Sequence, residues 1–69
     1  MLKEVKTLRL TEERHPTEQD VWEAYQVATG QHCIVELEWF LPHYGLKKWI
    51  ISEQDNIQDL LTNLHITTA

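Results

Sequence analysis

One ten-residue segment alternates more regularly than any other part of the chain, and it limits the folds that are open to it. Every second position of residues 32–41 is apolar: Cys33, Val35, Leu37, Trp39 and Leu41. The positions between them are mixed: His32, Ile34, Glu36, Glu38 and Phe40. A period of two is typical of a β-strand with one face against a core. The segment therefore predicts a strand over residues 32–41.

Two further strands are expected beside this one. Pro42–Gly45 has proline and glycine at its ends and predicts a turn, so residues 46–51 return as the second strand of a hairpin. Near the N-terminus, Leu8 and Leu10 alternate with Arg9, which favours a strand over residues 4–10. Residues 11–16 predict the loop that follows it.

The first predicted helix starts after Thr17. The Thr17 hydroxyl can accept a hydrogen bond from the amide three residues on, where Asp20 stands in a position like that of a capping box. Four apolar residues then follow helical spacing: Val21, Ala24, Tyr25 and Ala28. Gly30 is the predicted C-terminal stop.

The second predicted helix starts at Ser52, with Asp55 three residues later repeating the capping pattern. Its apolar stripe consists of Ile57, Leu60, Leu61 and Leu64. Residues 66–69 are largely β-branched and terminal, so we expect them to fray or to form a short extended tail.

The predicted order is β-α-β-β-α, an α+β fold in a single small globular domain over residues 1–69. Each helix has one apolar side, so the simplest arrangement is a three-stranded sheet with two helices packed on one face. The sequence leaves open which of the later strands pairs with the first. The most buried residues are expected to be Val35, Leu37, Trp39, Leu60, Leu61 and Leu64.

Metal and thiol chemistry have weak support in the sequence. Cys33 is the only cysteine, so no disulfide forms within the chain, and a single thiol fits a reducing, cytoplasmic compartment. No stretch reaches the ~20 apolar residues needed to cross a bilayer. The candidate ligands His15, His32, Cys33, His43 and His65 show no metal-binding spacing, and we expect no metal or other cofactor.

One pair of carboxylates is the only candidate for acid–base catalysis. Glu36 and Glu38 are two residues apart on the same predicted strand face. Paired carboxylates can transfer protons, so a small enzyme that uses Glu36 and Glu38 is a further hypothesis. The alternative is a solvated strand face that meets Lys47 or Lys48 across the hairpin, and the sequence favours it.

The aromatic content points instead to an interaction surface. The chain has three tryptophans, more than a small core needs. A sheet covered on one side leaves Ile34 and Phe40 exposed, together with either Trp49 or Ile50. Contiguous exposed apolar residues mark sites of association. We therefore predict a protein partner or a homodimer that uses this face or an edge strand.

The charge is strongly acidic, with a formal net charge of −5. Most of the acidic excess falls in residues 11–30 and 53–69, both predicted to contain helices. Direct binding to nucleic acid is therefore disfavoured. The leading hypothesis is a non-enzymatic interaction or regulatory protein, such as an inhibitor, adaptor or accessory subunit. The alternative is a mimic of nucleic-acid charge whose contacts are Glu18, Glu23, Asp55 and Asp59.

Overall fold

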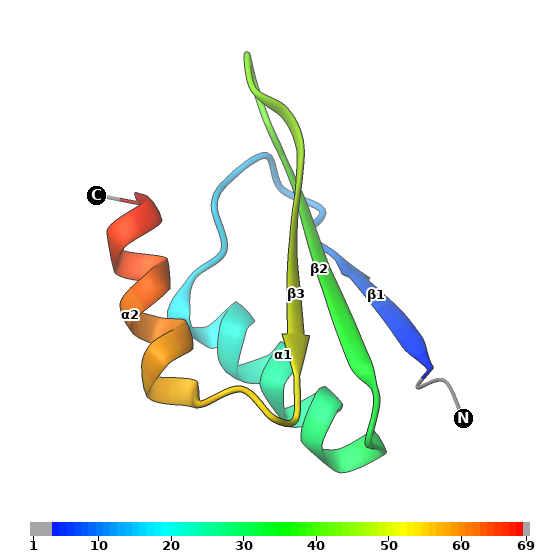
Figure 1. The fold of residues 1–69 in the computed structure, drawn as a ribbon. Helices are drawn as coiled ribbons and strands as arrows, with labels where there is room; N and C mark the ends of the chain where they lie inside the picture. Colours follow the sequence, from blue (N-terminus) through cyan, green and yellow to red (C-terminus); the bar gives the residue numbers. More distant parts are fainter. Residues whose placement is uncertain (1–3, 69) are drawn as a thin grey trace.

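A computed structural model describes residues 4–68 of the chain (Figure 1). The order of elements is β1 (Val5–Arg9), α1 (Glu18–Gln31), β2 (Ile34–Leu41), β3 (Gly45–Ser52) and α2 (Ile57–Thr68). The β-α-β-β-α prediction is therefore confirmed.

The sheet has the order β1-β2-β3, so β2 is its central strand. Strand β1 runs parallel to β2, with Val5 opposite Ile34 and Arg9 opposite Glu38. Strand β3 is antiparallel to β2, and the hairpin closes with Leu41 opposite Gly45. The segment with the clearest alternation thus occupies the position with a neighbour on each side, which answers the pairing question left open by the sequence.

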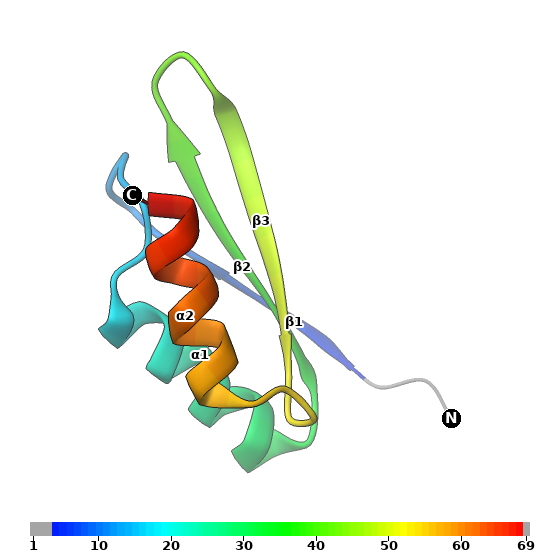
Figure 2. The same cartoon turned by 60° about the vertical axis from the view of Figure 1, so that its left-hand side comes forward.

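Both helices lie on the same side of the sheet, and the other face has no helix against it (Figure 2). Helix α1 contacts β2, β3 and α2. The buried apolar residues between these layers are Val21, Ala24, Ala28, Cys33, Val35, Leu37, Trp39, Ile51, Leu60 and Leu64. Leu61 was expected among them but is only partly buried. Leu60 and Leu64 point into the core, and Leu61 lies at the margin of the same stripe.

Helix α1 begins as predicted and ends later than predicted. The amide of Asp20 donates to Thr17 Oγ1, and the amide of Thr17 donates to the Asp20 carboxylate, which completes a capping box. Gly30 is not the stop: the helix continues through Gln31, and His32 closes it with a left-handed φ of 52°. The turn falls there because Cys33, the next residue, enters the core and donates its amide to Ala28 O.

Helix α2 begins five residues after the predicted start. Ser52 ends β3, and its amide donates to the Asp55 carboxylate, which closes a turn before the helix. Asn56 is the residue that caps the helix, since its Oδ1 accepts the amide of Gln58 at 2.8 Å. A hydroxyl residue followed three positions later by a carboxylate residue can close a turn as well as cap a helix. Here it closes a turn, and the helix starts only where its apolar stripe starts, at Ile57.

Residues 66–69 were predicted to fray or to form a short extended tail, but residues 66–68 belong to a helix. Helix α2 continues to Thr68, while Ala69 lies outside the described residues. A β-branched residue costs a helix less than about 0.7 kcal/mol. The buried Leu64, one turn earlier, anchors this end of the helix. Neither described helix is long and apolar enough to span a membrane.

Candidate functional site

The face of the sheet away from the helices, here called the open face, carries the interaction residues predicted from the sequence. The strand register places alternate residues there: Val5, Thr7 and Arg9 from β1, Ile34, Glu36, Glu38 and Phe40 from β2, and Leu46, Lys48, Ile50 and Ser52 from β3. Apolar residues lie at both ends of this set, and charged residues lie between them.

Four large apolar side chains of the open face are accessible to solvent. Towards one end, Val5 of β1, opposite Ile34, and Ile50 of β3, opposite Glu36, are 53% and 54% exposed. Phe40 and Leu46, directly opposite one another at the other end, are 46% and 49% exposed. Ile34 is half-buried. Each end of the face therefore presents an apolar patch.

Trp49 does not belong to the open face. It pairs with Leu37 of β2, whose side chain is in the core, so Trp49 lies on the side of the helices. Ile50 takes the exposed position instead. The sequence predicted that one of the two would face outward, and the closure of the hairpin at Leu41 and Gly45 decides which one.

A row of ion pairs crosses the middle of the open face. Arg9 donates from Nε and Nη2 to Oε2 of Glu38 at 3.1 and 2.8 Å. Lys48 Nζ lies 3.0 Å from Glu36 Oε1 and 3.6 Å from Glu38 Oε1. The Glu38 side chain is only 7% exposed. The side chains of Arg9 and Lys48, which pair with it, are 67% and 51% exposed. The open face thus has two cations and two carboxylates and no net charge.

These ion pairs affect the protonation of Glu38, one of the two glutamates predicted as an acid–base pair. The hydrogen bonds from Arg9 lower the pKa of Glu38 from its ordinary value of 4.5, although burial acts in the opposite direction. The hydrogen bond to Glu36 raises the pKa of Lys48. A general acid at neutral pH needs a raised pKa. The lowered pKa is the opposite of this requirement, so the arrangement favours a structural role for Glu38.

The acidic residues proposed for charge mimicry lie on the other side of the molecule, and they differ in their surroundings. Glu23 and Asp59 are exposed on α1 and α2. Glu18 is also exposed, but its Oε1 lies 2.9 Å from His65 Nε2 and links the two helices. Asp55 lies in the turn before α2, where its carboxylate accepts the Ser52 amide. It is therefore not on a helical face, contrary to the prediction.

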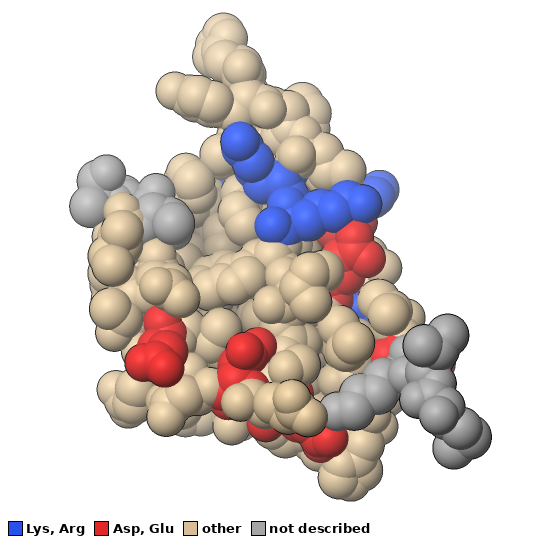
Figure 3. All heavy atoms as spheres, in the orientation of Figure 1, with Lys and Arg blue, Asp and Glu red and all other residues tan. Residues whose placement is uncertain are grey.

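The distribution of charge over the surface is uneven. On the face seen in Figure 3, Lys and Arg gather over the middle of the hairpin, and most Asp and Glu lie lower, over the helices. On this face, most acidic side chains thus lie away from the cluster of Lys and Arg.

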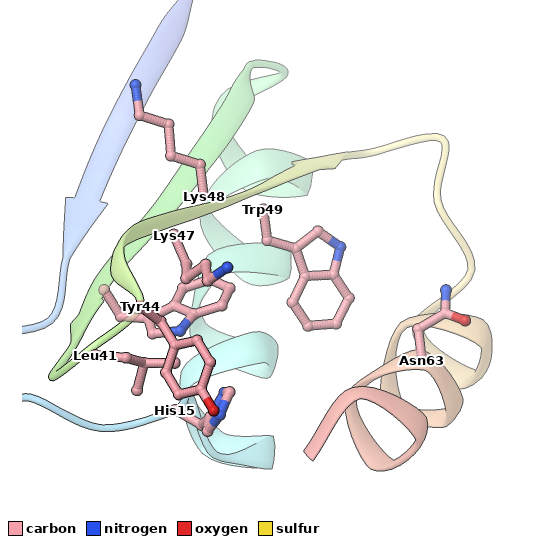
Figure 4. Close-up of a pocket in the computed structure, with 8 residues that line it drawn as sticks. His15, Leu41, Tyr44, Lys47, Lys48, Trp49 and Asn63 are labelled. Carbon is pink, nitrogen blue, oxygen red and sulfur yellow. The ribbon is translucent and has the colours of Figure 1, made fainter. Parts of the chain in front are cut away.

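A second surface feature is a cavity of about 600 Å³ on the helical side, here called the hairpin groove. It is lined by His15, Trp39, Leu41, Tyr44, Lys47 and Trp49. Asn63 of α2 closes the opposite side, with Trp49 between α2 and the hairpin turn (Figure 4). Lys48 also borders the groove, but its side chain points away from the other labelled side chains (Figure 4).

Aromatic contacts organise this groove. The rings of His15 and Trp39 are 6.4 Å apart between centroids, and Lys47 Nζ lies 5.9 Å from the centre of the Tyr44 ring. Tyr44 is 73% exposed and lies in the three-residue turn between β2 and β3. The groove is therefore made of residues from the 11–16 loop, the hairpin and α2.

Within residues 4–68, no three His, Cys, Asp or Glu side chains gather closely enough to hold a metal ion. The predicted candidates lie apart: His32 Nδ1 contacts Glu53 at 2.8 Å, whereas His65 contacts Glu18. Cys33 is a free thiol, 1% exposed, and its Sγ lies 3.8 Å from Val27 O. Its surroundings suit a packing role.

Sequence reasoning missed several residues of both surfaces. Val5, Arg9 and Leu46 belong to the open face, and the alternation within each strand carried that signal once the register was known. The groove residues His15, Tyr44 and Lys47 come from separate segments, and no local pattern joins them. Comparisons of the chain with protein-family models, curated proteins and solved structures found no match.

Proposed function

We propose that this chain is a small, non-enzymatic interaction protein of the cytoplasm that associates through its open face. The observation that carries the proposal is the set of four apolar side chains, 46–54% exposed, on a face without net charge. Exposed apolar patches, such as the one that Phe40 and Leu46 form directly opposite one another, mark association sites. The buried single thiol is in keeping with a reducing compartment.

A second copy of the chain is the partner that fits this face best. A two-fold interface brings the same surface together from both copies. Apolar patches lie at both ends of the face and the charged row lies between them, so apolar ends meet apolar ends when the two-fold axis runs along the strands or perpendicular to them. The acidic helices then lie on the outside of the dimer, where repulsion between copies of net charge −5 is smallest.

Sedimentation equilibrium tests this proposal with a matched pair of isoleucines. Ile50 is 54% exposed on the open face, and Ile66 is 68% exposed on α2. The wild type is expected to form a dimer in the micromolar range. Ile50→Ala and Phe40→Ala should weaken the dimer about fivefold or more if these residues are anchors of the interface, since truncation of an anchor side chain costs over ~1 kcal/mol. Ile66→Ala should leave it unchanged.

Two outcomes would contradict self-association through the open face. One is a wild-type protein that stays monomeric at ~100 μM, well above the micromolar affinity range. The other is an equal loss of dimer in Ile50→Ala and Ile66→Ala, which would place the interface elsewhere.

Charge mimicry is the second candidate, and the uneven charge distribution favours it. Glu18, Glu23 and Asp59 are exposed on the helical side, where acidic residues gather (Figure 3). Such a surface would meet the basic, phosphate-binding surface of a nucleic-acid-binding protein. Its affinity would fall steeply with salt, because exposed charges are screened beyond a Debye length of ~8 Å at physiological ionic strength.

A further inference from the structure

The hairpin groove has a chemistry that the open face does not share. Its lining contains hydrogen-bond donors and aromatic rings and no carboxylate. This is notable in a chain in which acidic residues outnumber basic ones by eleven to six. The groove also lies on the opposite side of the sheet from the open face, so it can bind a ligand independently of self-association.

The first specific observation is an unpaired donor at Trp39. This residue is 9% exposed, and its Nε1–H is buried without a hydrogen-bond partner among the described residues. Buried polar side-chain atoms are nearly always hydrogen-bonded, since desolvation without a partner is unfavourable. Trp39 lines the groove, but this donor atom is itself closed to solvent, so an acceptor bound in the groove pairs with it only after neighbouring side chains move.

The second observation is the position of Lys47. Its ammonium lies at the groove, 5.9 Å from the centre of the Tyr44 ring. The neighbouring Lys48 instead pairs with Glu36 on the open face, at 3.0 Å. Within the groove lining, Lys47 therefore supplies a cation with no carboxylate beside it, which favours an anionic group on the ligand.

The third observation is the shape of the groove and the character of its walls. A volume of about 600 Å³ falls within the range of small-molecule sites, roughly 300–1,000 Å³. Trp39, Tyr44 and Trp49 present aromatic surfaces, which pack well against another planar ring. The Trp39 donor is closed to solvent, so a ligand oxygen reaches it only if the side chains that cover it change conformation. Tyr44 lies in the turn and is 73% exposed.

From these observations we propose that the hairpin groove binds a small planar aromatic carboxylate. The ring packs against the tryptophans, and the carboxylate accepts hydrogen bonds from the Lys47 ammonium and the Trp39 Nε1–H. The proposal does not depend on the dimer, because neither Lys47 nor Trp39 is part of the open face.

Heteronuclear NMR of the ¹⁵N-labelled full chain provides the test. Each of the three tryptophans gives one indole N–H signal, and single Trp→Phe variants assign them. The probes are 2-naphthoate and its neutral analogue 2-naphthamide. Naphthoate should shift the Trp39 and Trp49 signals in a saturable manner. Trp22, on α1 outside the groove lining, should not respond.

Two substitutions assign the roles of the donors. Lys47→Gln should weaken naphthoate binding by up to about fivefold, the range of a solvent-exposed ion pair, and leave naphthamide unaffected. Lys6→Gln is the control, because it removes the same charge from β1, away from the groove. Trp39→Phe keeps a ring but removes the N–H and should weaken binding about two- to tenfold. Its remaining backbone signals report whether it is folded.

Several outcomes would overturn the proposal. The first is no saturable shift at Trp39 and Trp49 with millimolar naphthoate, and the second is equal affinity for naphthoate and naphthamide. A comparable shift at Trp22 would mean non-specific contact. If dilution of the protein alone shifts the Trp39 and Trp49 signals, a second copy of the chain occupies the groove and the proposal fails. This last result would also move the dimer interface away from the open face, whereas the first two would leave it intact.

Discussion

Arg9 and Glu38 form a two-donor ion pair across neighbouring strands, with Nη2 and Nε of Arg9 at 2.8 and 3.1 Å from the same carboxylate oxygen. The two residues are direct register partners between β1 and β2. A carboxylate that is 7% exposed in the middle of a sheet face would be costly without such a partner. The pair therefore keeps β1 in register and makes the centre of the open face neutral.

The Arg9–Glu38 pair predicts a loss of stability in acid. The pKa of Glu38 is lowered in the folded protein, so its contribution is complete above the unfolded pKa and disappears as the pH falls through the folded pKa. The free energy of unfolding, measured with urea, should therefore decrease from about pH 4.5 downward. Glu38→Gln should be less stable than wild type at pH 7, and the difference should shrink at pH 3.

Exposed Glu23 on α1 supplies the control for this prediction, because Glu23→Gln should follow the wild-type profile. Some acid sensitivity should persist in Glu38→Gln. Burial alone would raise the pKa of Asp20, but hydrogen bonds from Arg14 and Thr17 outweigh it and lower the pKa. A constant gap between wild type and Glu38→Gln from pH 7 to pH 3 would show that the ion pair does not contribute.

Two leucines of α2 test which face of the helix packs into the core. Leu64 is 3% exposed, whereas Leu61 is only partly buried. Leu64→Ala should cost about 2–5 kcal/mol of unfolding free energy, the range for a buried leucine. Leu61→Ala should cost clearly less, because part of its side chain already contacts water. Urea denaturation of both variants measures this order, and an equal or larger loss at Leu61 would mean that α2 is rotated from its position here.

The start of α2 can be tested through its cap. Asn56→Ala removes the acceptor for the Gln58 amide and should cost about 0.5–2 kcal/mol. Gln54→Ala, in the preceding turn and exposed, is the matched control and should have little effect. Chemical denaturation again gives the values. If Asn56→Ala is as stable as wild type, the helix does not depend on this cap.

The sequence predicted the elements whose periodicity is local and missed features that depend on how elements meet. The alternation from Cys33 to Leu41 was sufficient to place the central strand. The Ser52–Asp55 spacing was not sufficient, because a hydrogen-bonded turn and a helix cap use the same pair of side chains. Whether Trp49 or Ile50 faces outward depends on the residues at which the hairpin closes. The alternation within one strand does not give this information.

The groove was beyond sequence reasoning for a related reason. His15, Tyr44 and Trp49 come from a loop, a turn and a strand, and only the tertiary fold brings these segments to one cavity. The unpaired Trp39 donor is likewise a property of its surroundings, since a tryptophan in a predicted strand gives no sign of whether its N–H has a partner.

The response of association to salt separates the two candidate functions by its sign. In a dimer formed through the open face, the two acidic helical layers repel each other weakly, and salt screens that repulsion. Raising NaCl from about 50 to 500 mM, which shortens the Debye length from over ~10 Å to below ~5 Å, should therefore leave the dimer unchanged or tighten it. Glu18→Gln combined with Asp59→Asn should tighten the dimer at low salt and converge with wild type at high salt. A dimer that weakens steeply with salt would contradict a neutral apolar interface and indicate that the ion pairs of Arg9 and Lys48 are exchanged between the copies. Charge mimicry predicts the opposite behaviour toward a basic partner: loss of affinity with salt, and slower association after the same two substitutions.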